Sequence, residues 1–248
     1  MAKREITDRF RGQVFGTFWA ILHPLILILV YIFLFVLVFK VRIGGTVTMP
    51  LDYTTYILSG LIPWLMIQDA MAKSCTVIVG SANLVKQVVF PIEVLPVKTV
   101  IASMVSMGIS LAFLLVYVLC TQHIFFWTYA LLPVLIVLLI LAMVGIAYFL
   151  SAAGVYIRDM KDFVQVFNFV GFFLIPMFYL PEQVPRVLRP ILYINPFSYF
   201  IWCFQDALYF GRFLHWWAWI AYGLMSLTFF YGGYRIFKRL KVMFGNAL

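Results

Sequence analysis

Acidic and basic side chains are rare inside the long apolar stretches of this sequence. Asp69 is the only acid well within one of them, and Lys73 follows it four residues later. A helix places residues at this spacing on one face, so the two side chains are predicted to form an ion pair. Charges inside apolar segments are typical of proton or ion pathways. A single local pair, however, favours a structural role over a proton relay.

The sequence contains none of the common motifs for nucleotide hydrolysis or hydrolytic catalysis. GxxxxGK[ST], HExxH and GxSxG are all absent. The histidines, His23, His123 and His215, are isolated from one another, and each is expected to have a structural role near a membrane interface. Each of the three cysteines lies alone in an apolar stretch, which is typical of small buried side chains. We therefore expect no catalytic residue, metal or cofactor in this chain.

The composition indicates an integral membrane protein. The chain has 248 residues, of which 65% are hydrophobic and 11% charged, and its mean hydropathy is +1.04. A soluble domain of this length needs a more charged surface. The net charge of +9 would suggest nucleic acid as a partner for a soluble protein. Here it more simply reflects topology, because basic residues gather in cytoplasmic loops, and no nucleic-acid partner is expected.

Six apolar stretches are long enough to cross a bilayer as helices, which takes about 20 residues. The fold class is therefore predicted to be all-α, with six transmembrane helices in a single domain. The predicted spans are residues 20–39, 53–79, 97–119, 129–153, 163–180 and 217–237. An even number of spans puts both termini on one side, and that side holds thirteen of the 18 lysines and arginines. Both termini are therefore predicted to be cytoplasmic.

Two segments outside the spans are predicted to lie at the membrane surfaces. In residues 1–19, Ile6, Phe10, Val14 and Phe18 recur every fourth residue, which predicts an amphipathic helix on the cytoplasmic interface. Its role is either a simple membrane anchor or a lateral entry site near the lipid phosphates, which Arg9 and Arg11 would contact. Residues 181–216 are external and rich in proline and aromatic residues. They predict short re-entrant or interfacial helices near an exit path, with a helical cap on the outer surface as the alternative.

The cytoplasmic connection after the second span is unusually apolar. It reads LVKQVVFPIEVLPV from Leu84 to Val97. This segment is too short and too polar to cross a bilayer, yet more apolar than an ordinary linker. It is therefore predicted to pack against another surface.

Five blocks of the sequence, in their order and spacing, resemble the ABC-2-type permeases that export O-antigen, capsule and teichoic-acid polysaccharides. The blocks are RFRGQVFGTFWAILHPLILILVYIFLF, YILSGLIPWLMIQDAM, ANLVKQVVFPIEVLPV, YIRDMKDF and YINPFSYFIWCFQDALYFG. The resemblance implies a homodimer in the inner membrane of a bacterial cell, together with two copies of a separate ABC ATPase subunit that binds ATP and Mg. It also implies contact with membrane lipids and a lipid-pyrophosphate-linked glycan as cargo.

The resemblance also assigns roles to particular residues. A coupling helix at residues 81–90 would dock on the ATPase through one apolar face and adjacent polar groups, and its residues are Asn83, Leu84, Val85, Lys86, Gln87, Val88 and Val89. Arg158 and Asp159 would form a second contact, unless they belong to an ordinary basic loop. A channel between the two copies would be lined partly by aromatic rings, which suit sugars. The candidates are Trp19, Tyr31, Trp64, Tyr193, Phe197, Tyr199 and Trp202.

Other functions fit some of the same features. One is an ABC-2 permease for a different cargo, such as a lipid, a drug or haem. Another is a multispan membrane transferase, although that would require clustered acids or histidines at a membrane face, which the sequence does not contain. A third is a membrane scaffold.

Overall fold

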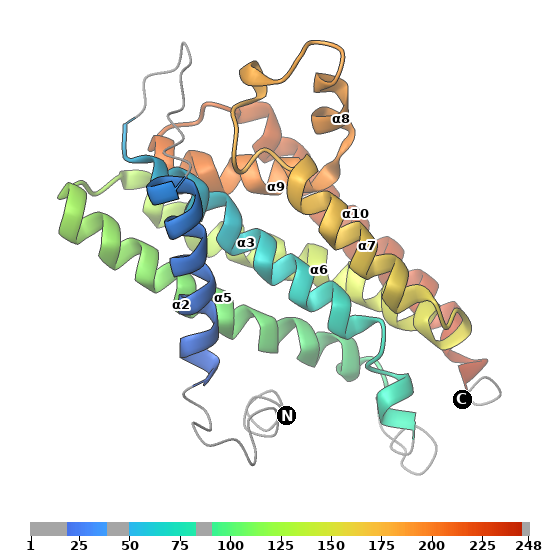
Figure 1. Cartoon of the computed structure of the whole chain (residues 1–248). Coiled ribbons are helices and arrows are strands. Elements are labelled where there is room, and N and C mark those ends of the chain that lie inside the picture. The colour runs from blue at the N-terminus through green and yellow to red at the C-terminus, as the bar shows by residue number, and fades with distance from the viewer. Residues whose placement is uncertain (1–18, 39–49, 83–90, 245–248) are drawn as a thin grey trace.

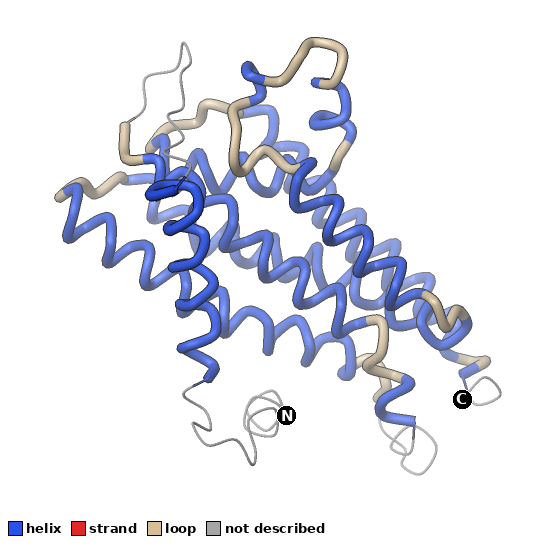
Figure 2. Tube along the Cα trace, viewed as in Figure 1, coloured by secondary structure: helices blue, strands red, loops and turns tan. Residues whose placement is uncertain are grey.

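The computed structural model of the protein describes residues 19–38, 50–82 and 91–244, and every regular element within them is a helix (Figures 1 and 2). The long helices are α2 (Trp19–Ile32), α3 (Tyr53–Ser74), α5 (Val94–Gln122), α6 (Leu132–Tyr156), α7 (Met160–Leu174) and α10 (Trp216–Lys241). The short ones are η2 (Phe33–Val38), η3 (Val79–Ser81), η4 (Trp127–Leu131), η5 (Pro181–Gln183), α8 (Arg189–Ile194), α9 (Pro196–Gln205) and η6 (Asp206–Phe210). The predicted all-α class is confirmed for these residues. Residues 1–18 of the predicted interfacial helix and 83–90 of the predicted coupling helix lie outside them.

Each long helix overlaps one of the six predicted spans. Within the described residues, two helices have the length and apolarity to cross a membrane, Val94–Gln122 and Trp127–Tyr156. By contrast, α7 has 15 residues. At 1.5 Å per residue it is about 23 Å long, which is shorter than the roughly 30 Å hydrocarbon layer. The count of six crossings therefore stays a prediction.

The helix in the fifth predicted span, α7, begins and ends earlier than residues 163–180. It ends at Leu174, and Ile175 is extended, with φ −91° and ψ 138°. Pro176 follows, and a proline disfavours helical geometry in the residue before it. The apolar run continues beyond this point, so hydropathy alone overextended the helix.

Contacts between distant residues define one end of the bundle, which we call the basic end. Lys241, the last residue of α10, forms an ion pair of 2.7 Å with Glu93, which precedes α5. The Tyr156 hydroxyl at the end of α6 donates a hydrogen bond to the Leu240 carbonyl at 3.0 Å. In Figure 1 this end also holds the end of α3 and the start of α7.

The opposite end of the bundle is rich in tyrosine and tryptophan, and we call it the aromatic end. Asp52 caps the first turn of α3 and accepts a hydrogen bond of 2.7 Å from the Tyr117 hydroxyl, near the end of α5. The Thr128 hydroxyl in η4 donates to the Ala207 carbonyl in η6 at 2.7 Å. Helices α8 and α9 lie at this end (Figure 1).

The described lysines and arginines are unevenly divided between the two ends. Three belong to the aromatic end, namely Arg186, Arg189 and Arg212. Eight lie toward the basic end, namely Lys73, Lys98, Arg158, Lys161, Arg235, Lys238, Arg239 and Lys241. This division has the sense that the positive-inside rule assigns to a cytoplasmic basic end. The orientation itself stays a prediction.

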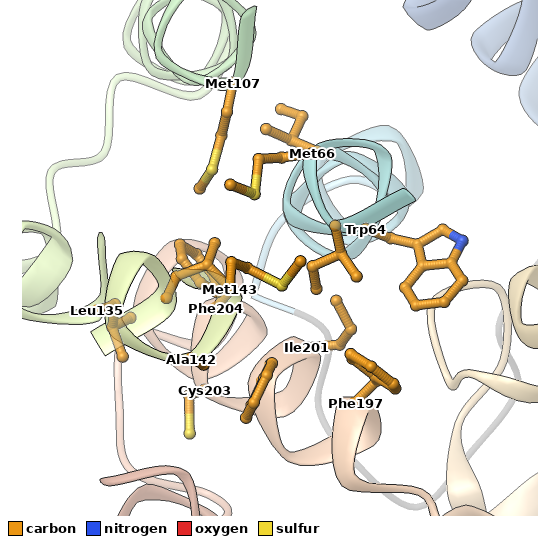
Figure 3. Close-up of a cluster of buried hydrophobic side chains, with 14 of the residues drawn as sticks. Trp64, Met66, Met107, Leu135, Ala142, Met143, Phe197, Ile201, Cys203 and Phe204 are labelled. Carbon is orange, nitrogen blue, oxygen red and sulfur yellow. The ribbon is translucent and has the colours of Figure 1, made fainter. Parts of the chain in front are cut away.

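The short helix α9 is packed into the bundle. It contacts α3, α6 and α10, and every side chain from residue 200 to residue 210 is buried. Figure 3 shows Ile201 and Phe204 of α9 directed toward Met143 of α6 and the side of α3. The predicted external region thus contains short helices, as expected, and their apolar residues form part of the core.

Candidate functional site

A buried carboxylate organises the aromatic end. Asp206 has 0% exposure, and its side chain accepts three hydrogen bonds. Two come from His215, through its backbone N–H at 2.9 Å and its Nδ1 at 2.9 Å, and one from Trp219 Nε1 at 3.2 Å. A buried carboxylate is costly unless it is hydrogen-bonded in this way. The network ties η6 to the start of α10 across the turn at Gly211, which has a positive φ of 63°.

The His215 ring of this network belongs to a group of five aromatic rings. The His215 ring stacks on Trp202 with a centroid distance of 5.4 Å and an interplanar angle of 12°. Trp202 also contacts Tyr193, Tyr199 and Trp217, at 5.4, 5.6 and 5.1 Å. Three of the predicted pathway residues, Tyr193, Tyr199 and Trp202, are therefore brought together here. The side chains of His215 and Trp217 complete the group, which sequence reasoning did not connect with them.

Exposure separates the members of this aromatic group. Trp202 is 1% exposed, whereas Tyr193 is 43% exposed. Tyr199 is half-buried, and its hydroxyl donates to the Tyr193 carbonyl at 2.7 Å. A molecule outside the chain would therefore reach the tyrosines first, with Trp202 behind them.

Two more predicted pathway residues, Trp64 and Phe197, meet in the core. Their rings are 5.8 Å apart and nearly perpendicular, at 73°. Trp64 is 0% and Phe197 6% exposed. The Trp64 indole extends away from Met66, Met107 and Met143 (Figure 3). It lies against Gly171 of α7, where a Cβ would be 2.9 Å from the ring. In the single chain these rings pack against other helices and do not form a surface.

The last two pathway candidates lie on α2, apart from the other five. Tyr31 contacts Phe172 of α7, with ring centroids 5.6 Å apart. Trp19 is the first residue of α2 and is half-buried. Tyr31 therefore lies where the end of α2 approaches α7, and Trp19 lies at the opposite end of α2.

A polar seam between α3 and α7 was not predicted. The Gln68 side chain donates to the Asn168 carbonyl at 2.8 Å, and the Asn168 side chain donates to the Gln68 carbonyl at 3.2 Å. The two residues are 100 positions apart, so no local pattern links them. Such a reciprocal pair fixes the register of α7 against α3, because a shift of one helix along the other would leave both side chains without their hydrogen-bond partners.

The predicted ion pair between Asp69 and Lys73 is confirmed, and the two side chains are in direct contact. Asp69 also accepts a hydrogen bond of 2.7 Å from the Ser103 hydroxyl of α5. The pair therefore joins α3 to α5 near the basic end. This third partner supports the structural role over a proton relay.

Of the residues predicted to meet a partner subunit, Arg158 and Asp159 are described, and they lie at the basic end. Arg158 and Asp159 are both exposed in the turn between α6 and α7. The seven coupling-helix candidates, 83–89, and the two predicted lipid-phosphate contacts, Arg9 and Arg11, lie outside the described residues.

Glu93, which comes three residues after the predicted coupling helix, forms an ion pair with Lys241 of α10. Partial burial works against the Glu93 carboxylate, but the Lys241 ammonium and the charge of Lys238 outweigh it, so the pKa of Glu93 is lowered. The charged pair joins the start of α5 to the end of α10. The ion pair therefore connects the two ends of α5 and α10 that lie at the basic end.

The sequence of this chain is similar to those of known transport proteins. Residues 1–209 match the ABC-2 type transporter family. An O-antigen export system permease protein RfbA of Klebsiella pneumoniae is 25% identical over 258 aligned positions, covering 100% of this chain and 93% of the relative. A protein of the same name from Myxococcus xanthus is 24% identical, covering 100% of this chain and 94% of the relative. The resemblance predicted from the five sequence blocks is thereby confirmed.

Proposed function

Because this chain belongs to the ABC-2 type transporter family, we propose that it is the permease subunit of an ATP-driven exporter of a lipid-linked polysaccharide. The observation that carries the proposal is the alignment of O-antigen export permeases with the whole of this chain. A polysaccharide of the O-antigen type is therefore the cargo that we assign.

Two further kinds of chain complete the exporter in this proposal. One is a second copy of this chain, and the other is an ABC ATPase subunit, present twice, which binds ATP and Mg. The assembly lies in the bacterial inner membrane with the basic end facing the cytoplasm. The division of eight and three basic residues between the two ends supports that orientation.

The ATPase contact is assigned to the basic end. Residues 83–89 dock on the ATPase, and Arg158 and Asp159 make a smaller contact beside them. The exposure of Arg158 and Asp159 supports this assignment. The Glu93–Lys241 ion pair then passes the movement of the docked segment to α10.

The glycan enters from the cytoplasmic leaflet, where Arg9 and Arg11 contact the lipid phosphates, and leaves past the aromatic end. The partly exposed rings are assigned to direct glycan contact, and they are Trp19, Tyr31, Tyr193 and Tyr199. The buried rings support them from inside the wall, and they are Trp64, Phe197 and Trp202. Aromatic faces suit this task because sugar C–H groups stack on them while polar groups bind the hydroxyls.

A co-purification experiment tests the ATPase contact. The tagged chain is purified from membranes as wild type and as Leu84→Asp/Val88→Asp. The matched control is Val187→Asp/Ile194→Asp, which also adds two charges at two exposed aliphatic residues, both at the aromatic end. We expect the ATPase subunit with the wild type and the control, and its loss from the Leu84→Asp/Val88→Asp protein. Recovery with all three proteins would move the docking surface elsewhere. Recovery with none of them would contradict the exporter.

A further inference from the structure

The final turns of α10 carry a stripe of exposed cations. Arg235, Lys238 and Arg239 all face away from the bundle, whereas Phe237 and Phe244 on the opposite side are buried. The stripe is therefore fixed in its outward direction by the packing of the other face.

Among the described residues, no acidic side chain forms an ion pair with a cation of this stripe. The Glu93 carboxylate is paired with Lys241, and the charge of Lys238 also acts on it. The Arg235 guanidinium instead lies over the Tyr231 ring, 4.3 Å from its centroid. Three cations so close together on one helix repel one another, and their positions near the negative C-terminal end of the helix offset this only in part. An external anion would neutralise them.

Along the outward face of α10, apolar, aromatic and basic residues follow one another in the same order as the layers of a membrane. Ile220, Leu224 and Leu227 are exposed and apolar, and exposed Tyr231 follows them. Arg235 comes one turn later, about 12 Å along the helix from Leu227. Hydrocarbon, interface and phosphate layers follow one another in the same order, and aromatic residues are enriched at the interface.

From this order of groups we propose that Arg235, Lys238 and Arg239 bind the headgroup phosphate of an acidic phospholipid, with Tyr231 at the interface. The face of α10 above them lies against the acyl chains. The site is independent of the exporter's cargo, because it depends only on the insertion of α10 in a bilayer. A bound acidic lipid would hold the end of α10 in place, next to the Glu93–Lys241 link.

Lipid titration followed by native mass spectrometry tests this site. The detergent-purified chain is titrated with phosphatidylglycerol and, separately, with phosphatidylcholine of the same acyl composition. The test variant is Arg235→Gln/Arg239→Gln. The matched control is Arg186→Gln/Arg212→Gln, which removes two exposed arginines at the aromatic end. Arg235→Lys/Arg239→Lys keeps the charge, and size-exclusion profiles check the fold of every protein.

We expect the wild type to prefer phosphatidylglycerol over phosphatidylcholine. Each cation near anionic lipid contributes about fivefold in affinity, so the glutamine pair is expected to lower phosphatidylglycerol affinity about 25-fold. The control and the lysine pair should keep most of the preference. Equal phosphatidylglycerol affinity for the wild type and the glutamine pair would overturn the proposal. So would loss of a co-purifying acidic protein from the glutamine pair without any change in lipid preference, since the stripe would then be a protein-docking site.

Discussion

The contact between α6 and α10 gives the most direct test of the packing. Gly145 and Gly233 face each other, and a Cβ built on Gly233 would lie 1.9 Å from the Gly145 carbonyl oxygen. Ordinary contact begins at 3.4 Å, so Gly233→Ala requires the helices to separate locally by about 1.5 Å. Backbone atoms form the obstacle, and no side-chain rotation relieves it. Small residues at such crossings let membrane helices approach closely.

The size of the effect follows from the cost of overpacking, which is about 1–3 kcal/mol. For a chain of this length, about 2 kcal/mol lowers the melting temperature by about 4–8 °C. The neighbouring Gly232→Ala is the matched control, because its Cβ would meet nothing within 4 Å. Alanine is the better helix former by about 0.5–1 kcal/mol, so the control should melt at the same temperature or higher.

The assay is thermal unfolding of the detergent-purified proteins, followed by loss of the monodisperse size-exclusion peak. A Gly233→Ala protein that melts with or above Gly232→Ala would refute the close approach of α6 and α10.

Three further predictions concern charged groups. Lys241→Glu should lower the free energy of unfolding by about 1 kcal/mol, which is the usual contribution of a partly exposed ion pair. Glu93→Lys/Lys241→Glu should restore it. Absence of such coupling in a double-mutant cycle would exclude the Glu93–Lys241 ion pair. The pKa of Glu93 is lower in the folded protein, so the contribution of the pair is present above the ordinary glutamate pKa and is lost as the pH falls through the folded value. The difference in stability between the wild type and Glu93→Gln should therefore shrink as the pH falls below about 4.3, and a constant difference down to pH 3 would contradict this sign. Asp206→Asn should lower the free energy of unfolding by about 1–3 kcal/mol, because the amide N–H₂ would face donors that now point at a buried carboxylate. The control is Asp162→Asn, at an exposed residue. Equal melting temperatures of the two variants would show that the network does not stabilise the fold.

Local spacing predicted what lies within one or two helical turns. The Asp69–Lys73 pair was predictable because a helix fixes the geometry of residues four apart. The helices near the six apolar runs were predictable because burial in lipid requires long apolar segments. The early end of α7 depends instead on Pro176, a local steric signal that the apolar run hides.

Contacts between residues far apart in the chain could not be predicted from the sequence. Asp206 meets His215 only because the chain reverses at Gly211, and neither residue alone indicates this. The Gln68–Asn168 pair joins positions 100 apart. The proline and aromatic residues of 181–216 predicted short helices there. Which of the aromatic rings are buried depends on how α9 packs between α3 and α10.

Reconstituted transport tests the proposed function most directly. The chain and its ATPase subunit are placed in proteoliposomes that carry a fluorescent lipid-linked O-antigen polysaccharide on the ATPase-facing side, and delivery to the opposite side is measured. We predict delivery that needs both subunits and ATP hydrolysis. A complex that hydrolyses ATP at its full rate while the polysaccharide stays where it was placed would contradict the proposed cargo.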